Sequence, residues 1–224
     1  MLDTSPLAPH TLFVVLGVPI SRTVVTSWAI MAVLTVVSWL GTRRMALRPG
    51  RWQACLEIVV ETINTQIRAV IGRDPSPYLA LLGTLFLFLV TANLSILVPG
   101  ASPPTADLAT PAALAIVVFL AVHFFGVRAR GARDYLKHYA EPNLLLLPLN
   151  VLSEITRTFS LTIRLFGNIM SHEFVIGIVV VLAGLFVPIP FMALGVLIGI
   201  VQAYIFTILA SVFIGAAIGS IEGG

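Results

Sequence analysis

The chain has few charged residues. Only 10% of its 224 residues are Asp, Glu, Lys or Arg, whereas 58% are apolar, and its mean hydropathy is +1.02. A soluble globular domain carries about 25% charged residues, so this chain has too few to cover a water-facing surface. The composition excludes an ordinary soluble domain and predicts a protein for which lipid is the main solvent.

Cysteine and catalytic motifs are also scarce. The single cysteine, Cys55, excludes an internal disulfide framework, and its surroundings give no indication of metal ligation. Residues 1–20 lack the features of a signal or transit peptide, and there is no phosphate-binding GxxxxGK[ST] loop. We therefore expect no cofactor, no metal and no catalysis by this chain alone.

The basic residues do not indicate nucleic-acid binding, although the formal net charge is +3. They lie at the edges of apolar runs, where they anchor and orient a membrane protein. Arg43 to Arg51 and Arg128 to Lys137 fall on one side, and the loop from Pro99 to Leu108 has no Lys or Arg. The positive-inside rule then puts the N-terminus outside and the C-terminus in the cytoplasm. Without a targeting segment, we expect a multi-pass protein of the bacterial inner membrane.

Long apolar runs predict an all-α fold with about five membrane-embedded helices in one domain. A span needs about 20 apolar residues to cross roughly 30 Å of hydrocarbon. The predicted embedded helices cover residues 23–43, 77–98, 109–128, 142–187 and 190–220.

Residues 52–71 predict a different kind of helix, amphipathic and lying at the membrane interface or against a neighbouring helix. The predicted polar face carries Glu57, Glu61, Asn64 and Arg68. The opposite, apolar face carries Trp52, Cys55, Val59, Ile63 and Val70. Ordinary amphipathic packing accounts for this pattern and assigns the two glutamates no chemistry.

The last two helices are too long to stand upright. Residues 148–186 have no proline after Pro148, and 39 residues of helix extend about 58 Å, nearly twice the hydrocarbon thickness. Pro188 and Pro190 mark a turn, after which another overlong helix follows. The sequence therefore predicts a slanted C-terminal helical hairpin.

Arg164 lies inside the first helix of that hairpin. A cation at the bilayer centre costs about 2.5–3.5 kcal/mol on insertion scales, so such residues face protein or water, or have a function. Snorkelling to the interface is the simpler alternative. At 100° per residue, Arg157, Ser160, Asn168 and Ser171 fall within about 40° of Arg164.

Glu173 points the opposite way. It lies about 180° from Arg164 around the helix and about 13 Å further along, while His172 lies at the edge of the polar stripe. Two polar routes that do not meet would let ions pass without a direct leak. This geometry predicts an ion-translocating membrane protein.

Three motifs then resemble those of one family, subunit a of F-type ATP synthases. They are the run from Ser160 to Asn168 (SLTIRLFGN) with Glu173, the run from Gln202 to Phe206 (QAYIF), and the run from Pro104 to Leu108 (PTADL). They occur in the family's order and spacing over the C-terminal 60% of the chain. The Arg-Leu-Phe-Gly-Asn element is specific, and each of the other two would be weak alone.

The resemblance implies a stator ion-channel subunit of a rotary ATP synthase. Arg164 would face the rotating c ring, keep its carboxylates ionised and separate two half-channels for protons or Na⁺. The partners would be the c-ring subunits, the peripheral-stalk b subunits, the rest of the ATP synthase and the lipid bilayer. The ion-translocating residues would be Arg164, Glu173, Asn168, Gln202 and His172, and further candidates for channel lining are Ser160, Ser171, Tyr204, Asp107 and Asn93.

The chain departs from the family pattern at three positions. Asn150 stands where many relatives have an acid, Thr158 where many have proline, and Gly195 where some have a titratable partner for the acid of the preceding helix. His172 could supply that partner from the same helix as Glu173, or could be a polar residue at the edge of the stripe. His123 is a lone histidine in a span, for which packing is a better interpretation than a proton relay.

Two other classes fit less well. A secondary transporter or permease subunit should show repeated halves with interrupted helices, and we find no such repeat. An intramembrane hydrolase could use Ser171, His172 and Glu173, but consecutive residues of a helix cannot converge on one substrate atom, and no HExxH pair is present.

Overall fold

The protein is described here from a computed structural model, which covers residues 11–15, 18–43, 50–97, 103–135, 147–184 and 187–219. The elements are β1 (Thr11–Val15), β2 (Val18–Ser21), α1 (Arg22–Thr42), α2 (Arg51–Ile71), α3 (Ser76–Leu94), η1 (Ser95–Leu97), η2 (Pro104–Ala106), α4 (Ala109–Arg130), α6 (Leu147–Ala183) and α7 (Pro188–Ala217). Predicted residues 98, 142–146, 185–186 and 220, and the basic residues Arg44, Arg48 and Lys137, lie outside the described part.

The prediction of an all-α membrane protein is confirmed. Within the described ranges, α1, α3, α4, α6 and α7 are long and apolar enough to cross a membrane, so the chain is a multi-pass membrane protein. One small element was not predicted: β1 and β2 pair as an antiparallel hairpin just before α1. Its strands are too short for an alternating pattern to stand out in an apolar sequence.

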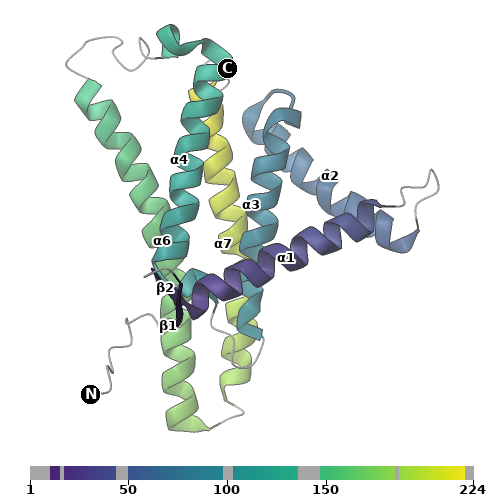
Figure 1. Cartoon of the computed structure of the whole chain (residues 1–224), viewed down its shortest axis with the longest axis vertical. Helices are drawn as coiled ribbons and strands as arrows, with labels where there is room; N and C mark the ends of the chain where they lie inside the picture. Colours follow the sequence, from purple (N-terminus) through teal and green to yellow (C-terminus); the bar gives the residue numbers. More distant parts are fainter. Residues whose placement is uncertain are drawn as a thin grey trace.

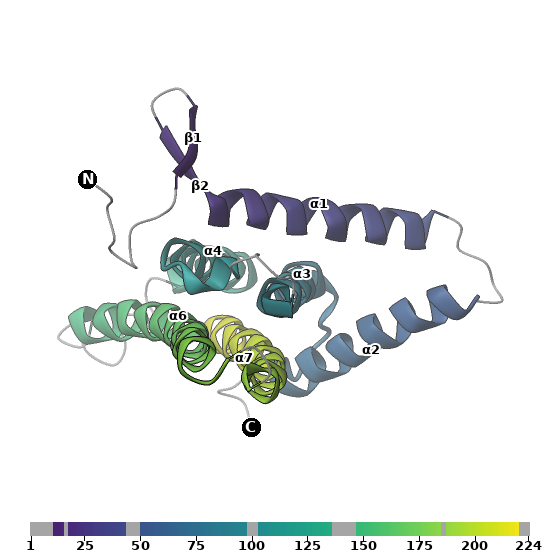
Figure 2. The same ribbon diagram turned by 90° about the horizontal axis from the view of Figure 1, so that it is seen from below.

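The helices form layers. Seen from below, α3 and α4 lie between α1 on one side and the pair α6 and α7 on the other (Figure 2). Helix α1 crosses the outer layer obliquely, and α2 runs from the end of α1 to the side of α7 (Figures 1 and 2). The hairpin of α6 and α7 is therefore supported by α4, α3 and α2.

The core lies where α2, α3, α4, α6 and α7 meet. Its buried residues are Ile63, Ile67, Ile71, Leu82, Leu85, Leu89, Ala115, Val118, Val122, Leu161, Leu165, Ala203, Phe206, Ala210, Ile214 and Ile218. Helix α1 has one described buried residue, Ile30, so most of its surface is left for lipid or for another chain.

The amphipathic helix α2 buries a slightly different face from the predicted one. Its buried residues are Ile63, Ile67 and Ile71, spaced by four, whereas Cys55 is exposed. The described residues of α2 that reach the core are Val59, Ile63, Ile67 and Ile71, and these contacts with the core select the buried face. Glu57 and Glu61 are exposed, as the polar face requires.

Helix ends follow local sequence. Gly72 adopts φ +69° and ends α2, and the pKa of Asp74 is lowered by hydrogen bonds from the Ser76 hydroxyl (2.7 Å) and backbone N–H (3.2 Å) at the start of α3. Gly184, at φ +79°, ends α6, and Pro188 begins α7 at a position where a missing N–H costs nothing.

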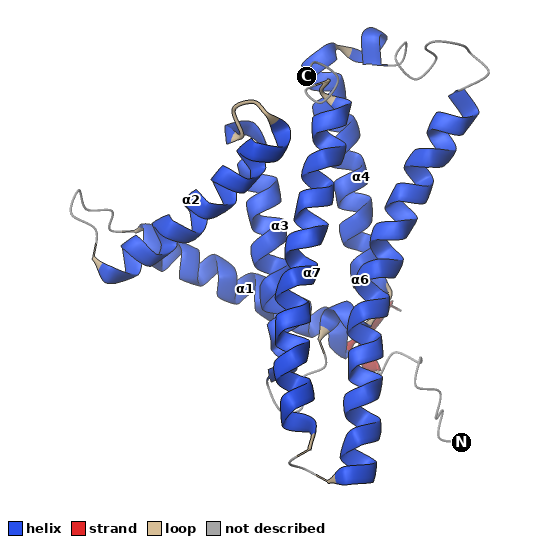
Figure 3. Cartoon of the chain, turned by 180° about the vertical axis from the view of Figure 1, so that it is seen from behind, coloured by secondary structure: helices blue, strands red, loops and turns tan. Residues whose placement is uncertain are grey.

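The two long helices α6 and α7 form the C-terminal hairpin. They lie side by side near their connection and diverge toward the other end, where α6 leans away from α7 (Figures 1 and 3). Helix α6 has 37 residues, which corresponds to about 55 Å of length. The divergence leaves space between the N-terminal half of α6 and the C-terminal half of α7.

Arg130 joins the end of α4 to the end of α7. Its Nη2 lies 3.5 Å from the carbonyl oxygen of Ala216, and its guanidinium fills the space where a side chain at Gly219 would begin. Gly219 has φ +74°, which favours glycine. We expect Gly219→Ala to destabilise the subunit by about 1–2 kcal/mol, because it adds backbone strain and displaces Arg130.

Heating the detergent-solubilised complex and following the loss of this subunit by immunodetection measures that effect. Gly50→Ala is the matched control, since Gly50 has negative φ and open space around its Cβ position. If the complex lost this subunit at the same temperature in both variants, the role given to Gly219 would be contradicted.

Candidate functional site

The face of α6 that packs inward is apolar and narrow. Leu161, Leu165 and Ile169 recur at intervals of four and are at most 4% exposed. This spacing places them on one side of the helix, in the contact with α4 and α7. Arg164 precedes Leu165 and is therefore turned away from the densest packing, and its side chain is exposed.

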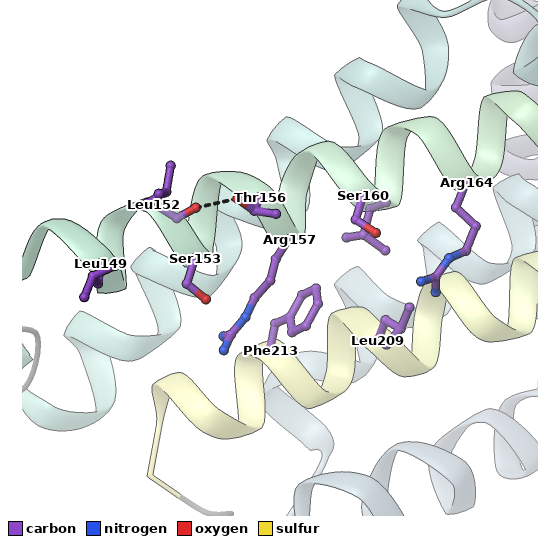
Figure 4. Close-up of a pocket in the computed structure, with 10 residues that line it drawn as sticks. Leu149, Leu152, Ser153, Thr156, Arg157, Ser160, Arg164, Leu209 and Phe213 are labelled. Atoms are coloured by element: carbon purple, nitrogen blue, oxygen red, sulfur yellow. Dashed lines mark hydrogen bonds between the residues drawn. The ribbon is translucent and has the colours of Figure 1, made fainter. Parts of the chain in front are cut away.

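Arg164 lines a groove between the diverging parts of α6 and α7 (Figure 4). The groove is lined by Leu149, Leu152, Ser153, Thr156, Arg157, Ser160, Leu161, Arg164, Leu209 and Phe213. Its floor combines apolar side chains with hydroxyls and two arginines, and none of these lining residues is acidic. The groove can therefore hold water or an approaching anion.

The two arginines extend from α6 toward α7 (Figure 4). Arg157 has its guanidinium carbon 5.5 Å from the centre of the Phe213 ring, which is a cation–π contact. Arg164 lies two helical turns further along, about 10 Å. Within the part of the chain that the structure describes, its guanidinium forms no hydrogen bond or ion pair, so its charge is available to a group from outside.

Immediately beyond Arg164 the groove ends in a polar contact between the two helices. Asn168 Nδ2 donates a hydrogen bond of 2.7 Å to Gln202 Oε1 on α7. Gln202 is 3% exposed whereas Asn168 is exposed, so this bond lies at the edge of the helix contact. Asn168 is one turn from Arg164 on the same face of α6, which places the pair next to the guanidinium.

Two polar atoms in the same contact have no hydrogen-bond partner among the described residues: Gln202 Nε2 and His172 Nδ1, both buried. A buried polar group without a partner costs about 1–3 kcal/mol, so each marks a place for a water molecule or for a polar ligand. His172 lies one turn beyond Asn168. The unpartnered atoms thus extend the line of polar groups along the seam between α6 and α7.

His172 packs against Gly195 of α7. A Cβ atom built on Gly195 would lie 3.5 Å from His172 Nδ1, which is ordinary contact distance. The imidazole of α6 therefore occupies the space beside a position on α7 that carries no side chain. The sequence left open whether His172 is an edge residue, and the structure places its ring between the two helices.

Glu173 and Ser171 are exposed on α6 and form no hydrogen bond among the described residues. Glu173 follows His172 directly, on the side of the helix opposite Arg164. Gly167 has open space where a Cβ would be, so no described helix of this chain approaches it. That surface of α6 is left free beside Arg164.

Asn93 holds three elements together about one turn from Gln202 along α7. Its Nδ2 donates to the carbonyl oxygen of Gly199 at 2.8 Å, and its Oδ1 accepts from Thr105 Oγ1 at 2.8 Å. Both Asn93 and Thr105 are buried. A Cβ on Gly199 would lie 2.8 Å from Asn93 Cβ, so this contact needs glycine.

The remaining predicted residues lie at other contacts. Asp107 accepts hydrogen bonds from Thr23 Oγ1 at 2.8 Å and from the backbone N–H of Ala109 at 3.2 Å, which ties the start of α1 to the start of α4. Tyr204 points away from α6 and contacts α2. Ser160 lines the groove beside Arg164.

His123 lies outside the groove. Its Nδ1 is 2.8 Å from the carbonyl oxygen of Phe119, and its ring contacts the rings of Phe119 and Tyr135. These contacts agree with the packing interpretation. Among the described residues no group of three His, Cys, Asp or Glu side chains could hold a metal ion.

Several residues of the site were not predicted from the sequence. Ser153 and Thr156 extend the hydroxyl lining of the groove, Thr105 pairs with Asn93, and Gln66 pairs with Tyr204. The groove residues could have been predicted from their angular position around the helix relative to Arg164. Nothing in the sequence indicates the other two pairings, because they depend on which helices are neighbours.

The fold and the site define a class: a multi-pass helical membrane protein in which an arginine without a partner among the described residues lies beside a polar contact between two long helices. The family model described as ATP synthase A chain matches residues 24–215. The chain belongs to this family.

Similar proteins cover most or all of its length. It is 60% identical over 223 residues to "ATP synthase subunit a 2" of Bradyrhizobium sp. (strain BTAi1 / ATCC BAA-1182), with 100% of each chain covered. It is 52% identical over 200 residues to "ATP synthase subunit a" of Albidiferax ferrireducens, covering 88% and 87% of the chains. It is 46% identical over 222 residues to "ATP synthase subunit a 2" of Pelobacter propionicus, covering 99% and 96%.

Proposed function

We propose that this chain is the stator ion-channel subunit of a rotary F-type ATP synthase. It passes protons or Na⁺ through two offset half-channels to and from the carboxylates of a rotating c ring. The observation that carries the proposal is Arg164, a cation inside a membrane helix that has no described partner and faces an open groove. Its partners are the c-ring subunits, the peripheral-stalk b subunits and the other subunits of the complex.

The charge of Arg164 gives the groove its chemistry. A carboxylate that comes within about 4–6 Å of a cation has its pKa lowered and favours the ionised form. A c-ring carboxylate arriving at Arg164 therefore releases its ion. Because a cation also repels a free ion, Arg164 prevents ions from crossing between the two half-channels without travelling on the ring.

The two half-channels approach Arg164 from different sides. The groove of Arg157, Ser160 and Arg164 forms one of them, open where α6 and α7 diverge. The other begins near Glu173 and continues past His172 along the seam toward Gln202. The Asn168–Gln202 hydrogen bond closes the seam between the two.

Charge gives the orientation. Arg128 and Arg130 end α4, and Arg130 contacts the last turn of α7, so these basic residues and the C-terminal end of α7 share one side. By the positive-inside rule this is the cytoplasmic side, with the N-terminus outside, in a bacterial inner membrane. The groove then opens to the cytoplasm and Glu173 belongs to the outer half-channel.

Vesicles that contain the assembled complex test this function. ATP addition should drive ion uptake, and His172→Leu should lower uptake per ATP hydrolysed by about tenfold. The reason is that loss of a side chain that transfers the ion raises the barrier to ion transfer by about 1.4 kcal/mol or more. The double variant His172→Gly with Gly195→His should recover much of the activity, since it returns an imidazole to the same space from α7. An ionophore specific for H⁺ or for Na⁺ identifies the coupling ion.

Absence of ATP-driven uptake by the unmodified complex would contradict the proposal as a whole. Full uptake in His172→Leu would remove His172 from the ion path and leave it as a packing residue. The control is His123→Leu, which changes a histidine outside the groove and should leave coupling unaltered.

A further inference from the structure

Helix α7 presents its polar residues to two different neighbours at the same level. Gln202 faces α6 and bonds to Asn168, whereas Tyr204, two residues later and thus about 160° around the helix, faces α2. Tyr204 Oη donates a hydrogen bond of 3.0 Å to Gln66 Oε1, across 138 residues of sequence. Figure 2 shows one end of α2 lying beside α7.

Much of the buried surface of α7 near these two residues is made of small side chains. The buried positions there include Gly195, Gly199, Ala203 and Ala210, together with the large Phe206 and the polar Gln202. Small residues permit close approach and resist rotation less than large ones do, so the rotation of α7 rests on Phe206 and on the hydrogen bonds that its side chains and backbone form. Directional hydrogen bonds must therefore contribute to setting the angle at which Gln202 is presented.

Helix α2 is a suitable support for this purpose. Its residues Ile63, Ile67 and Ile71 are anchored in the same core as Ala203 and Phe206 of α7. Gln66 immediately precedes the fully buried Ile67, so its backbone is held in place even though its side chain is exposed. A bond from Tyr204 to Gln66 thus connects α7 to a fixed point.

We propose that Tyr204 and Gln66 form a positioning pair, which sets the rotation of α7 and so holds Gln202 against Asn168 beside Arg164. The inference rests on the proposed ion path through Gln202. It makes Tyr204 a positioning residue that acts from the side of α7 facing away from the path. It also gives the amphipathic helix α2 a part in ion translocation, although α2 does not line the groove of Arg164.

Removing one partner at a time tests the pair in the assembled complex. Tyr204→Phe deletes only the hydroxyl, and Gln66→Met deletes the acceptor at an exposed site with little change in volume. Each should lower ATP-driven ion uptake per ATP hydrolysed by about three- to tenfold, and the double variant should lower it no further, because both remove the same bond. Gln66→Glu keeps an oxygen acceptor, so ion uptake in this single variant should stay near that of the unmodified complex.

A second measurement reports geometry without relying on ion transport. In a Cys55→Ser background, Asn168→Cys and Gln202→Cys allow a thiol-specific cross-linker with a two-carbon spacer to join α6 and α7. Adding Tyr204→Phe or Gln66→Met should slow the cross-linking by at least about threefold, whereas Gln66→Glu should leave its rate unchanged.

The outcomes separate this inference from the proposed function. Slower cross-linking with reduced uptake supports both. Slower cross-linking with full uptake supports the positioning pair and contradicts the place of Gln202 in the ion path. An unchanged cross-linking rate in Tyr204→Phe and Gln66→Met overturns the positioning pair, whatever the uptake.

Discussion

Arg164→Ala should abolish ion-coupled ATP synthesis and ATP-driven ion pumping, with a fall of about 100-fold or more, while the soluble head retains ATP hydrolysis. The physical reason is the charge pair that the variant cannot form. Two opposite charges about 4 Å apart near a protein surface interact by about 4 kcal/mol, and a loss of 2.7 kcal/mol already corresponds to 100-fold. The measurement is ATP synthesis and ion uptake in vesicles that contain the assembled complex.

The chain offers a matched control for this variant. Arg157→Ala removes a second arginine from the same groove and the same face of α6, but one that lies two turns away and packs on Phe213. We expect it to reduce coupling much less than Arg164→Ala. The loss of coupling in Arg164→Lys should lie between the losses in these two variants, because lysine keeps the charge and lacks the planar fork of donors. Full coupling in Arg164→Ala would reduce Arg164 to a structural anchor.

Gly199→Ala should prevent stable folding of the α3–α7 contact. The new Cβ would lie 2.8 Å from Asn93 Cβ, and neither atom is at the end of a flexible side chain. Overpacking costs about 1–3 kcal/mol. Displacing Asn93 would also leave Thr105 and the Gly199 carbonyl without their described partner, which adds about 1–3 kcal/mol. The total of about 2–6 kcal/mol is a large part of the stability of a typical domain.

The amount of this subunit recovered in the purified, intact complex measures that loss. Gly177→Ala is the matched control, because Gly177 also lies inside a long helix, is exposed, and has open space around its Cβ position. Adding Asn93→Gly to Gly199→Ala removes the overlap without restoring the hydrogen bonds, so recovery should be partial. Full recovery with Gly199→Ala alone would show that the two helices can separate without cost.

The sequence was most informative where one physical requirement dominates. Long apolar runs predict embedded helices, because a helix satisfies its own backbone groups in lipid. The helical angles of Arg157, Ser160 and Arg164 place them on one face, and the structure has them along one groove. Local patterns of this kind need no knowledge of neighbouring helices.

Contacts between distant helices were not predictable in this way. Pairing of Gln66 with Tyr204, or of Asn93 with Gly199, depends on which of the described helices lie next to α7. The burial of Ile67 and Ile71 instead of Cys55 has the same origin, since α3 and α7 cover only part of α2. The hairpin of β1 and β2 depends on pairing of short strands that the composition does not distinguish from its surroundings.

The divergence of α6 from α7 has an electrical consequence. Water that enters the groove has a high dielectric constant, so little of the membrane voltage falls along it, and the voltage is concentrated across the low-dielectric contact beyond Arg164. Moving one elementary charge through a full 100 mV is worth about 2.3 kcal/mol. In the proposed function, the segment around Asn168 and Gln202 would therefore experience a steep field, and the membrane potential would act on the ion at this segment.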